Sequence, residues 1–156
     1  KISRTANELV DSMSQIIWAM NPENDNIENI LGYLRKFSLD FFEDSGIRCE
    51  LSFPEIGQNI KLPQSVRRNL FLVIKETFHN ILKHSGAQEV RVKVSISSHH
   101  LKVVITDNGK GFDIEKVKYA GNGLNNMEKR MNTVNGRFHL ESNTVSGTTT
   151  TLEIGI

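Results

Sequence analysis

Apolar side chains in the first twenty residues recur alternately four and three residues apart, at Ile2, Ala6, Leu9, Met13, Ile16 and Met20. This heptad pattern predicts a helix over residues 1–20, which the Asn21-Pro22 step ends. Because the stripe is in phase from the second residue and no cap precedes it, we expect the second helix of a hairpin or coiled coil whose partner helix is missing. A simple amphipathic helix packed on its own domain is the alternative, since three heptads are few.

The period then changes several times. Residues 27–45 predict a second helix, with Gly46 as its C-terminal cap. From Ile47 the sequence IRCELSF alternates, which predicts a half-buried strand, and residues 54–63 predict a loop. Helical spacing returns over residues 64–84. The apolar stripe of this third helix consists of Val66, Leu70, Val73, Ile74, Phe78, Ile81 and Leu82.

The last third of the chain contains a predicted hairpin, a helix and two more strands. Apolar alternation over residues 90–96 and 101–105 flanks the short turn SSHH. Residues 123–134 are predicted helical, and residues 137–143 and 148–156 are predicted strands. Helices and antiparallel hairpins in this order favour an α+β fold, a two-layer α/β sandwich in which one mixed sheet carries helices on a single face.

Composition narrows the class of protein. A chain of 156 residues with 24% charged residues can form one well-buried globular core plus an appendage. The net charge of +1 divides into −5 for residues 1–60 and +6 for residues 61–156, so the second part could attract an anion, although ordinary solvated faces explain the asymmetry equally well. The sequence contains no run of basic residues with interleaved aromatic residues, so nothing in it favours nucleic-acid binding. Cys49 is the only cysteine, which excludes an internal disulfide and a cysteine-rich zinc site, and neither a long apolar run nor a signal-peptide pattern is present.

A polar stripe interrupts the third predicted helix. Glu76, Asn80, Lys83 and His84 stand at i, i+4, i+7 and i+8, so they share one face. A carboxylate, an amide oxygen, an ammonium and an imidazole along one line could hold a divalent cation and a phosphate chain. An ordinary exposed helix face is the alternative.

Two pairs of glycines lie farther along the chain. Asp107 directly follows a predicted strand, where it can present a carboxylate at the floor of a pocket, and Gly109 and Gly111 remove side chains that would keep a planar ligand away. Gly121 and Gly123 lead into a predicted helix, whose first amides could meet phosphate oxygens. Taken singly, each pair is also typical of a common turn or a flexible loop.

Taken together and in order, these motifs resemble the ATP-binding catalytic domain of sensor histidine kinases. The resemblance rests on ETFHNILKHSGA, DNGKGF, GNGLNNMEKRM and the closing SGTTTTLEI, and it covers residues 47–156. The wider superfamily includes DNA gyrase, the mismatch-repair ATPase MutL and a class of heat-shock chaperones. The first motif, with Glu four residues before Asn and KHSGA after it, together with a short lid and GLNNMEKR, is most similar to the nitrate-sensor-like branch. WAMNPENDNIENI resembles the stretch that links hairpin and ATPase domain in large periplasmic-sensing kinases of that branch.

The resemblance implies a Bergerat-type ATPase fold and a role for each motif residue. Asp107 would accept a hydrogen bond from the adenine amino group, Gly109 and Gly111 would let the backbone approach base and sugar, and Thr148 would help to fix the base. Asn80 would be the protein ligand of Mg²⁺, and Glu76 would act as base or orienting group. Residues 113–122 would form the ATP lid. The remaining residues implied to contact the nucleotide are Lys83, His84, Gly121, Gly123 and Leu124.

One departure from the family bears on the reaction. The phosphoacceptor histidine is expected in a motif like ELHD, and here ELVD has Val10 at that place. Residues 1–22 fit the second helix of the dimerisation hairpin better, with residues 23–156 as the catalytic domain, so the acceptor is expected before Lys1. The resemblance further implies homodimerisation in the full-length protein, a response regulator receiver domain as partner, and a cytoplasmic location in a membrane-anchored bacterial sensor. This chain alone is expected to bind ATP without labelling itself.

Three functions remain open from the sequence. The first is transfer of the γ-phosphoryl of Mg-ATP to a histidine, mostly by positioning and charge neutralisation. The second is an ATP hydrolase, a clamp of the gyrase or MutL kind, or an anti-sigma-type serine kinase. The third is a dimerisation or docking module whose nucleotide site has decayed, against which the intact Asn80, Asp107 and both glycine pairs speak.

Overall fold

The computed structural model describes residues 2–156, without the side chains of residues 2–4, 11, 12, 119 and 120. A long helix, α1 (Ile2–Met20), is followed by α2 (Ile27–Phe42), β1 (Arg48–Ser52) and α3 (Gln64–Asn80). The chain continues through β2 (Glu89–Ser97), β3 (His100–Asp107), α4 (Ile114–Ala120), α5 (Gly123–Thr133), β4 (Arg137–Asn143) and β5 (Gly147–Gly155). Two short helical segments are the 3₁₀ turn η1 (Pro22–Asn24) and the π-helical turn η2 (Ile81–Ser85).

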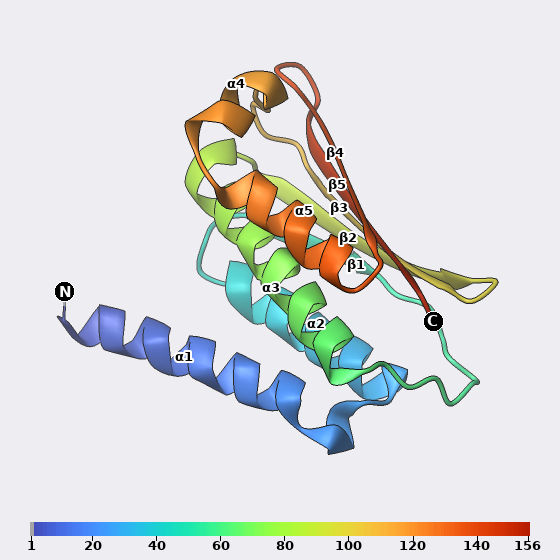
Figure 1. The fold of residues 1–156 in the computed structure, drawn as a ribbon. Coiled ribbons are helices and arrows are strands. Elements are labelled where there is room, and N and C mark those ends of the chain that lie inside the picture. The colour runs from blue at the N-terminus through green and yellow to red at the C-terminus, as the bar shows by residue number, and fades with distance from the viewer. Residues whose placement is uncertain (1) are drawn as a thin grey trace.

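The five strands form one mixed sheet in the order β1-β2-β3-β5-β4. Strand β1 runs parallel to β2, and the other neighbours are antiparallel. Helices α2, α3 and α5 lie on the same face of the sheet (Figure 1). The predicted two-layer α+β fold is therefore confirmed.

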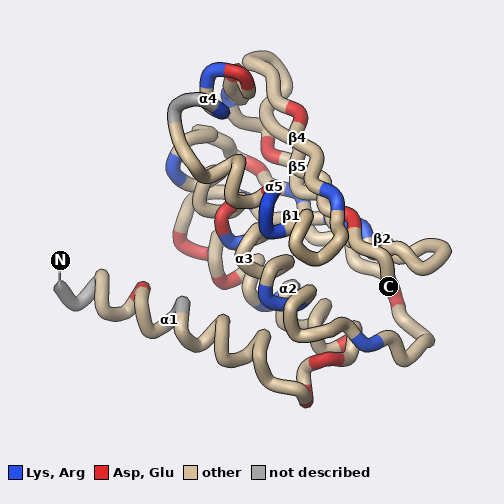
Figure 2. Tube along the Cα trace, viewed as in Figure 1, with Lys and Arg blue, Asp and Glu red and all other residues tan. Residues whose placement is uncertain are grey.

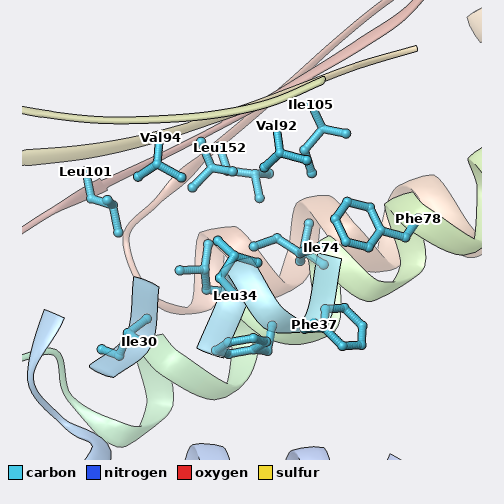
Figure 3. Packing of buried hydrophobic residues seen from close by; sticks show 14 of the residues in the cluster. Ile30, Leu34, Phe37, Ile74, Phe78, Val92, Val94, Leu101, Ile105 and Leu152 are labelled. Carbon is cyan, nitrogen blue, oxygen red and sulfur yellow. The ribbon is translucent and has the colours of Figure 1, made fainter. Parts of the chain in front are cut away.

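The core lies between the sheet and its helices. Along β2 and β3 every second side chain is buried, as the apolar alternation predicts, except Ile96 near the end of β2, which is half-buried. Figure 3 shows Val92, Val94 and Ile105 pointing from the sheet towards Ile74 and Phe78 of α3. Burial of this apolar layer is the main favourable contribution to folding, and it fixes the face of α3 that is left for the site.

Helix α1 matches the predicted residues 1–20 within the described part, but its apolar stripe is not buried by this chain. Leu9 and Met13 are 61% and 60% exposed, whereas Ala19 near the end is buried. The Ile2 side chain lies outside the described residues. Figure 2 shows that the described part of α1 is uncharged apart from one acidic position near its start. The dimerisation role of this helix remains a prediction. No helix within residues 2–156 combines the length and the apolar character needed to cross a bilayer.

A buried arginine joins the end of α1 to the globular domain. The Arg67 side chain, on a residue that is only 2% exposed, donates from Nε to the Ala19 carbonyl at 2.9 Å and from Nη1 to the Leu62 carbonyl at 2.6 Å. Its Nη2 donates to the Asn21 carbonyl at 3.3 Å. A cation at the C-terminus of a helix satisfies carbonyls that have no partner within the helix. Arg67 therefore caps α1 and holds it to α3.

We expect Arg67→Ala to lower the free energy of unfolding by about 2–3 kcal/mol, because the buried junction loses three hydrogen bonds, although the Asn21 carbonyl keeps its bond from the Asn24 amide. The neighbouring Arg68 is exposed, so Arg68→Ala removes the same charge as a control and should cost less than about 0.5 kcal/mol. Urea unfolding of the two variants measures both values. Equal effects would show that the Arg67 junction does not stabilise the fold.

The structure differs from the sequence prediction at three places. Helix α2 ends at Phe42, before the positive-φ Gly46. The third helix does not continue regularly to residue 84, because its last turn is the π-helix η2, and Leu82 on that turn is 43% exposed instead of buried. The segment 113–122 contains α4, whose N-cap Asp113 accepts from the backbone amides of Glu115 and Lys116. That cap was the missed sequence signal for α4.

Candidate functional site

The polar end of α3 is positioned by the turn that follows it. Asn80 is the last residue of α3, and Lys83 and His84 lie on the π-helical turn η2. The Ser85 hydroxyl closes this turn by donating to the Ile81 carbonyl at 2.6 Å and accepting from the Ala87 amide at 3.0 Å. A π-helical turn is rare and often occurs at functional sites. Here it ends the helix beside the loop that follows β3.

Asp107 ends β3 and is 3% exposed. Its Oδ1 accepts a hydrogen bond from the Gly109 amide at 2.8 Å. Burial raises the pKa of this carboxyl above its ordinary value, while the backbone amides of Gly109 and Thr148 oppose the rise. Among the described residues its donors are backbone amides, so this buried carboxylate can still accept a hydrogen bond from a ligand group.

The first glycine pair is required by the protein's own packing. A Cβ at Gly109 would collide with the Ser85 carbonyl oxygen, and the Lys110 amide donates to that same oxygen at 2.8 Å. Gly111 has φ +59°, and a Cβ there would lie 2.6 Å from the Asn143 carbonyl carbon. These two glycines therefore let the loop 107–112 pass between η2 and the β4–β5 hairpin. The sequence predicted that they leave room for a planar ligand, and it did not predict this packing requirement.

We expect Gly111→Ala to destabilise the protein by about 2 kcal/mol or more, because it combines a left-handed backbone with a collision against Asn143. Gly57→Ala is the matched control, since a Cβ at that exposed loop position meets no atom within 4 Å. Urea unfolding measures the difference. A Gly111 variant as stable as the Gly57 variant would contradict the packing described for this loop.

The second glycine pair is open. A Cβ at Gly121 would meet no atom within 4 Å, and one at Gly123 would meet only Glu76 Oε1, at 3.5 Å. Gly123 begins α5, and the N-cap residue Asn122 makes no side-chain capping hydrogen bond. The first turn of α5 therefore faces Glu76 with amides that no capping side chain occupies, an arrangement suited to an anion.

A cavity of about 530 Å³ lies where these parts meet. Most of the predicted site residues line it: Glu76, Asn80, Lys83, His84, Asp107, Gly111, Gly121, Gly123, Leu124 and Thr148. Gly109 does not line it and lies against Ser85 instead. Asn80 and Asp107, which are far apart in the sequence, thus open onto one cavity.

Several lining residues were missed from the sequence. They are Lys110, Phe112, Val117, Met127 and Leu140. Lys110 and Phe112 lie within the DNGKGF motif, and this position could have identified them as residues that line the cavity. Met127 belongs to the apolar stripe of α5 and lies 3.6 Å from the Thr77 hydroxyl. Val117 comes from α4, a helix that was not expected from the sequence.

The cavity has an apolar end and a charged end. Near Asp107 its walls include Ile105, Phe112 and Leu140. At the Glu76 end it adjoins a second cavity of about 550 Å³ that shares Asn80 and Lys83 and adds Lys75, His79 and Arg130. Burial and the nearby ammonium groups of Lys75 and Lys83 lower the pKa of His79. The site therefore suits a ligand with a flat, weakly polar head and an anionic tail.

The comparison with known proteins agrees with this geometry. Residues 65–156 match the model of the family described as histidine kinase-, DNA gyrase B- and HSP90-like ATPases. The signal transduction histidine-protein kinase/phosphatase DegS of Brevibacillus brevis is 35% identical over 123 residues, which cover 79% of this chain and 31% of DegS. The sensor histidine kinase LiaS of Bacillus subtilis (strain 168) is 32% identical over 99 residues, covering 64% of this chain and 27% of LiaS.

The fold is also found among solved structures. The histidine kinase domain of the Erythrobacter litoralis EL346 blue-light activated histidine kinase superposes with a TM-score of 0.67 at 17% identity, over 81% of this chain and 60% of that one. The chain spans less than a third of the length of the two curated relatives. These relatives confirm the resemblance to sensor histidine kinases of the nitrate-sensor-like branch. Because the family model matches more than half of its residues, the chain belongs to the histidine kinase-, DNA gyrase B- and HSP90-like ATPases and carries a histidine kinase-type ATPase domain.

Proposed function

We propose that this domain binds Mg-ATP in the cavity between α3, the loop 107–112 and α5, and that it supports transfer of the γ-phosphoryl group to a histidine outside the domain, for relay to a response regulator. One observation carries the proposal: Asn80 and Asp107 line the same cavity. Family membership supports ATP as the ligand. The curated relatives, which are sensor histidine kinases, support histidine as the acceptor.

At the apolar end of the cavity, the base is held by Asp107. Its carboxylate accepts from the adenine amino group, which a guanine carbonyl oxygen in the same place would oppose. Phe112 and Leu140 supply apolar contact to the faces of the ring. Thr148, paired with Asp107 across β3 and β5, adds a hydroxyl beside the carboxylate.

At the charged end, the triphosphate is held by Lys83, His84 and the first turn of α5. Lys83 contributes a positive charge, His84 an imidazole and the first turn of α5 backbone amides, and all three line the cavity. Glu76 lies beside the start of α5, where it orients the attacking group or accepts its proton. Residues 113–122, including α4, form the lid over this end.

The magnesium ion fits this donor set only together with the nucleotide. Asn80 offers one amide oxygen to the cavity, and no cluster of three or more His, Cys, Asp or Glu side chains suited to a metal occurs among the described residues. Phosphate oxygens and water must supply the other ligands. When bound, the ion neutralises phosphate charge, and Asn80 is the residue of this chain that would hold it.

Calorimetric titration tests the binding step. With Mg²⁺ present, we expect ATP to bind at least about tenfold more tightly than GTP, because Asp107 matches only the adenine edge. Chelating the metal should weaken ATP binding. No heat of binding with either nucleotide, or equal affinities for the two, would contradict the proposed function.

A further inference from the structure

Ser142 lies beside the cavity but does not line it. It occupies the inner face of the edge strand β4 and is paired in register with Thr148 of β5. Its hydroxyl oxygen is the acceptor for the Phe112 amide at 2.9 Å, and it lies 2.7 Å from the Thr148 hydroxyl oxygen. Strands β4 and β5 are neighbours in Figure 1, so the contact crosses between two adjacent strands. Ser142 thus connects the first glycine loop to β5.

The direction of these hydrogen bonds follows from the groups involved. An amide N–H can only donate, so the Ser142 oxygen accepts from Phe112. The single Ser142 proton then needs an acceptor, and within the described part of the chain Thr148 Oγ1 is the one in reach. If Thr148 donated instead, the Ser142 proton would have no partner among the described residues and would not face the cavity, whereas the Thr148 proton can turn into the cavity that Thr148 lines. Ser142 therefore donates to Thr148.

The consequence is a Thr148 hydroxyl whose own proton is free to point elsewhere. Thr148 lines the cavity, and Ser142 is its one side-chain hydrogen-bond partner among the described residues. Its proton is thus available to a ligand beside the Asp107 carboxylate, which is an acceptor. An acceptor next to a donor matches adenine, whose amino group donates and whose N1 accepts. The corresponding edge of guanine has the opposite order.

We propose that Ser142 is a positioning residue that orients the Thr148 hydroxyl as a donor to adenine N1, directly or through one water, and so contributes to the choice of adenine nucleotides. This inference rests on the proposed function. Ser142 does not touch the base, and its effect passes through Thr148.

The test compares ATP with 1-deaza-ATP, in which a C–H group replaces N1, by calorimetric titration of several variants. The unsubstituted protein should bind ATP about tenfold more tightly than 1-deaza-ATP, as expected for one hydrogen bond to an otherwise unpaired donor. Ser142→Ala should reduce this ratio to about twofold or less, since the Thr148 hydroxyl loses its fixed direction. Ser142→Thr keeps the hydroxyl and should preserve the ratio.

The outcomes separate the inference from the proposed function. If the unsubstituted protein binds neither nucleotide, the proposed function fails. If it binds ATP and Ser142→Ala weakens both nucleotides equally, leaving the ratio unchanged, Ser142 is only structural and the inference is overturned. Should the alanine variant not fold, Ser142→Cys serves in its place, because a thiol fills the same position but is a weak donor and acceptor. An unchanged ratio in the cysteine variant would overturn the inference equally.

Discussion

Replacing Asp107 with asparagine is expected to weaken ATP binding by about 100-fold. The carboxylate is buried, and one of its oxygens already accepts from the Gly109 amide. In Asp107→Asn the amide oxygen keeps that bond, so the amide NH₂ turns towards the cavity and faces the adenine amino group, donor against donor. The loss is therefore larger than that of one neutral hydrogen bond, and discrimination against GTP should shrink at the same time.

Calorimetric titration with ATP and GTP measures this effect. The control is Asp44→Asn, the same chemical change at an exposed position after α2, which should leave both affinities unaltered. If Asp107→Asn bound ATP as tightly as the unsubstituted protein, Asp107 would not contact the base.

The same substitution should make the protein more stable, relative to the unsubstituted protein, as pH rises. Burial raises the pKa of Asp107 above its ordinary value of 3.8, so between 3.8 and the raised value the native state binds more protons than the unfolded state. The contribution of this group to stability therefore falls as pH increases through that window. Asparagine does not titrate, so the stability of Asp107→Asn relative to the unsubstituted protein should improve between about pH 4 and about pH 7. Urea unfolding at both pH values measures this difference in the free energy of unfolding. A difference that declined between the two pH values would show that the native pKa of Asp107 is lowered.

Replacing Glu76 with glutamine is expected to slow phosphoryl transfer by about 100-fold or more while changing ATP affinity less than about threefold. The carboxylate lines the cavity beside the start of α5, where we propose that the phosphates lie, and it is not among the residues proposed to hold the base. Its removal should therefore affect the reacting end of the nucleotide and leave most of the binding contacts intact.

The measurement is the rate of phosphohistidine formation in the full-length protein that contains this domain, together with nucleotide titration of the same variant. Glu128→Gln changes an exposed carboxylate on α5 and is the matched control, with an unaltered rate expected. A Glu76 variant that transfers phosphate at the normal rate would remove Glu76 from the reaction. One that no longer binds ATP would assign it to binding.

The elements with strong apolar periodicity were predictable from the sequence. The β2–β3 hairpin has the predicted strands, and its turn residues Ser98 and His99 both have positive φ, the geometry that a two-residue turn requires. That Asn80 and Asp107 line one cavity was predictable because the types and order of the motif residues are specific, whereas their roles in binding stay predictions. Each of these features depends on neighbours in the sequence or on a motif that can be read locally.

The features that were missed depend on contacts between distant segments. Arg67 has the spacing of the buried face of α3, but its partners are carbonyls from residues 19, 21 and 62, which a pattern of side chains does not reveal. Ser142 sits on the inward face of β4, and its role comes from Phe112, thirty residues earlier. The collision that requires glycine at position 111 comes from Asn143. Only the folded backbone brings these partners together.

Whether the end of α3 and the two glycine loops form one nucleotide site can be measured by an amide-resolved NMR titration with a non-hydrolysable ATP analogue and Mg²⁺. We expect the amide signals of residues 80–84, 107–112 and 121–124 to shift together and to fit a single dissociation constant. Shifts confined to one of these segments, or different dissociation constants for the α3 end and the loop after β3, would contradict it.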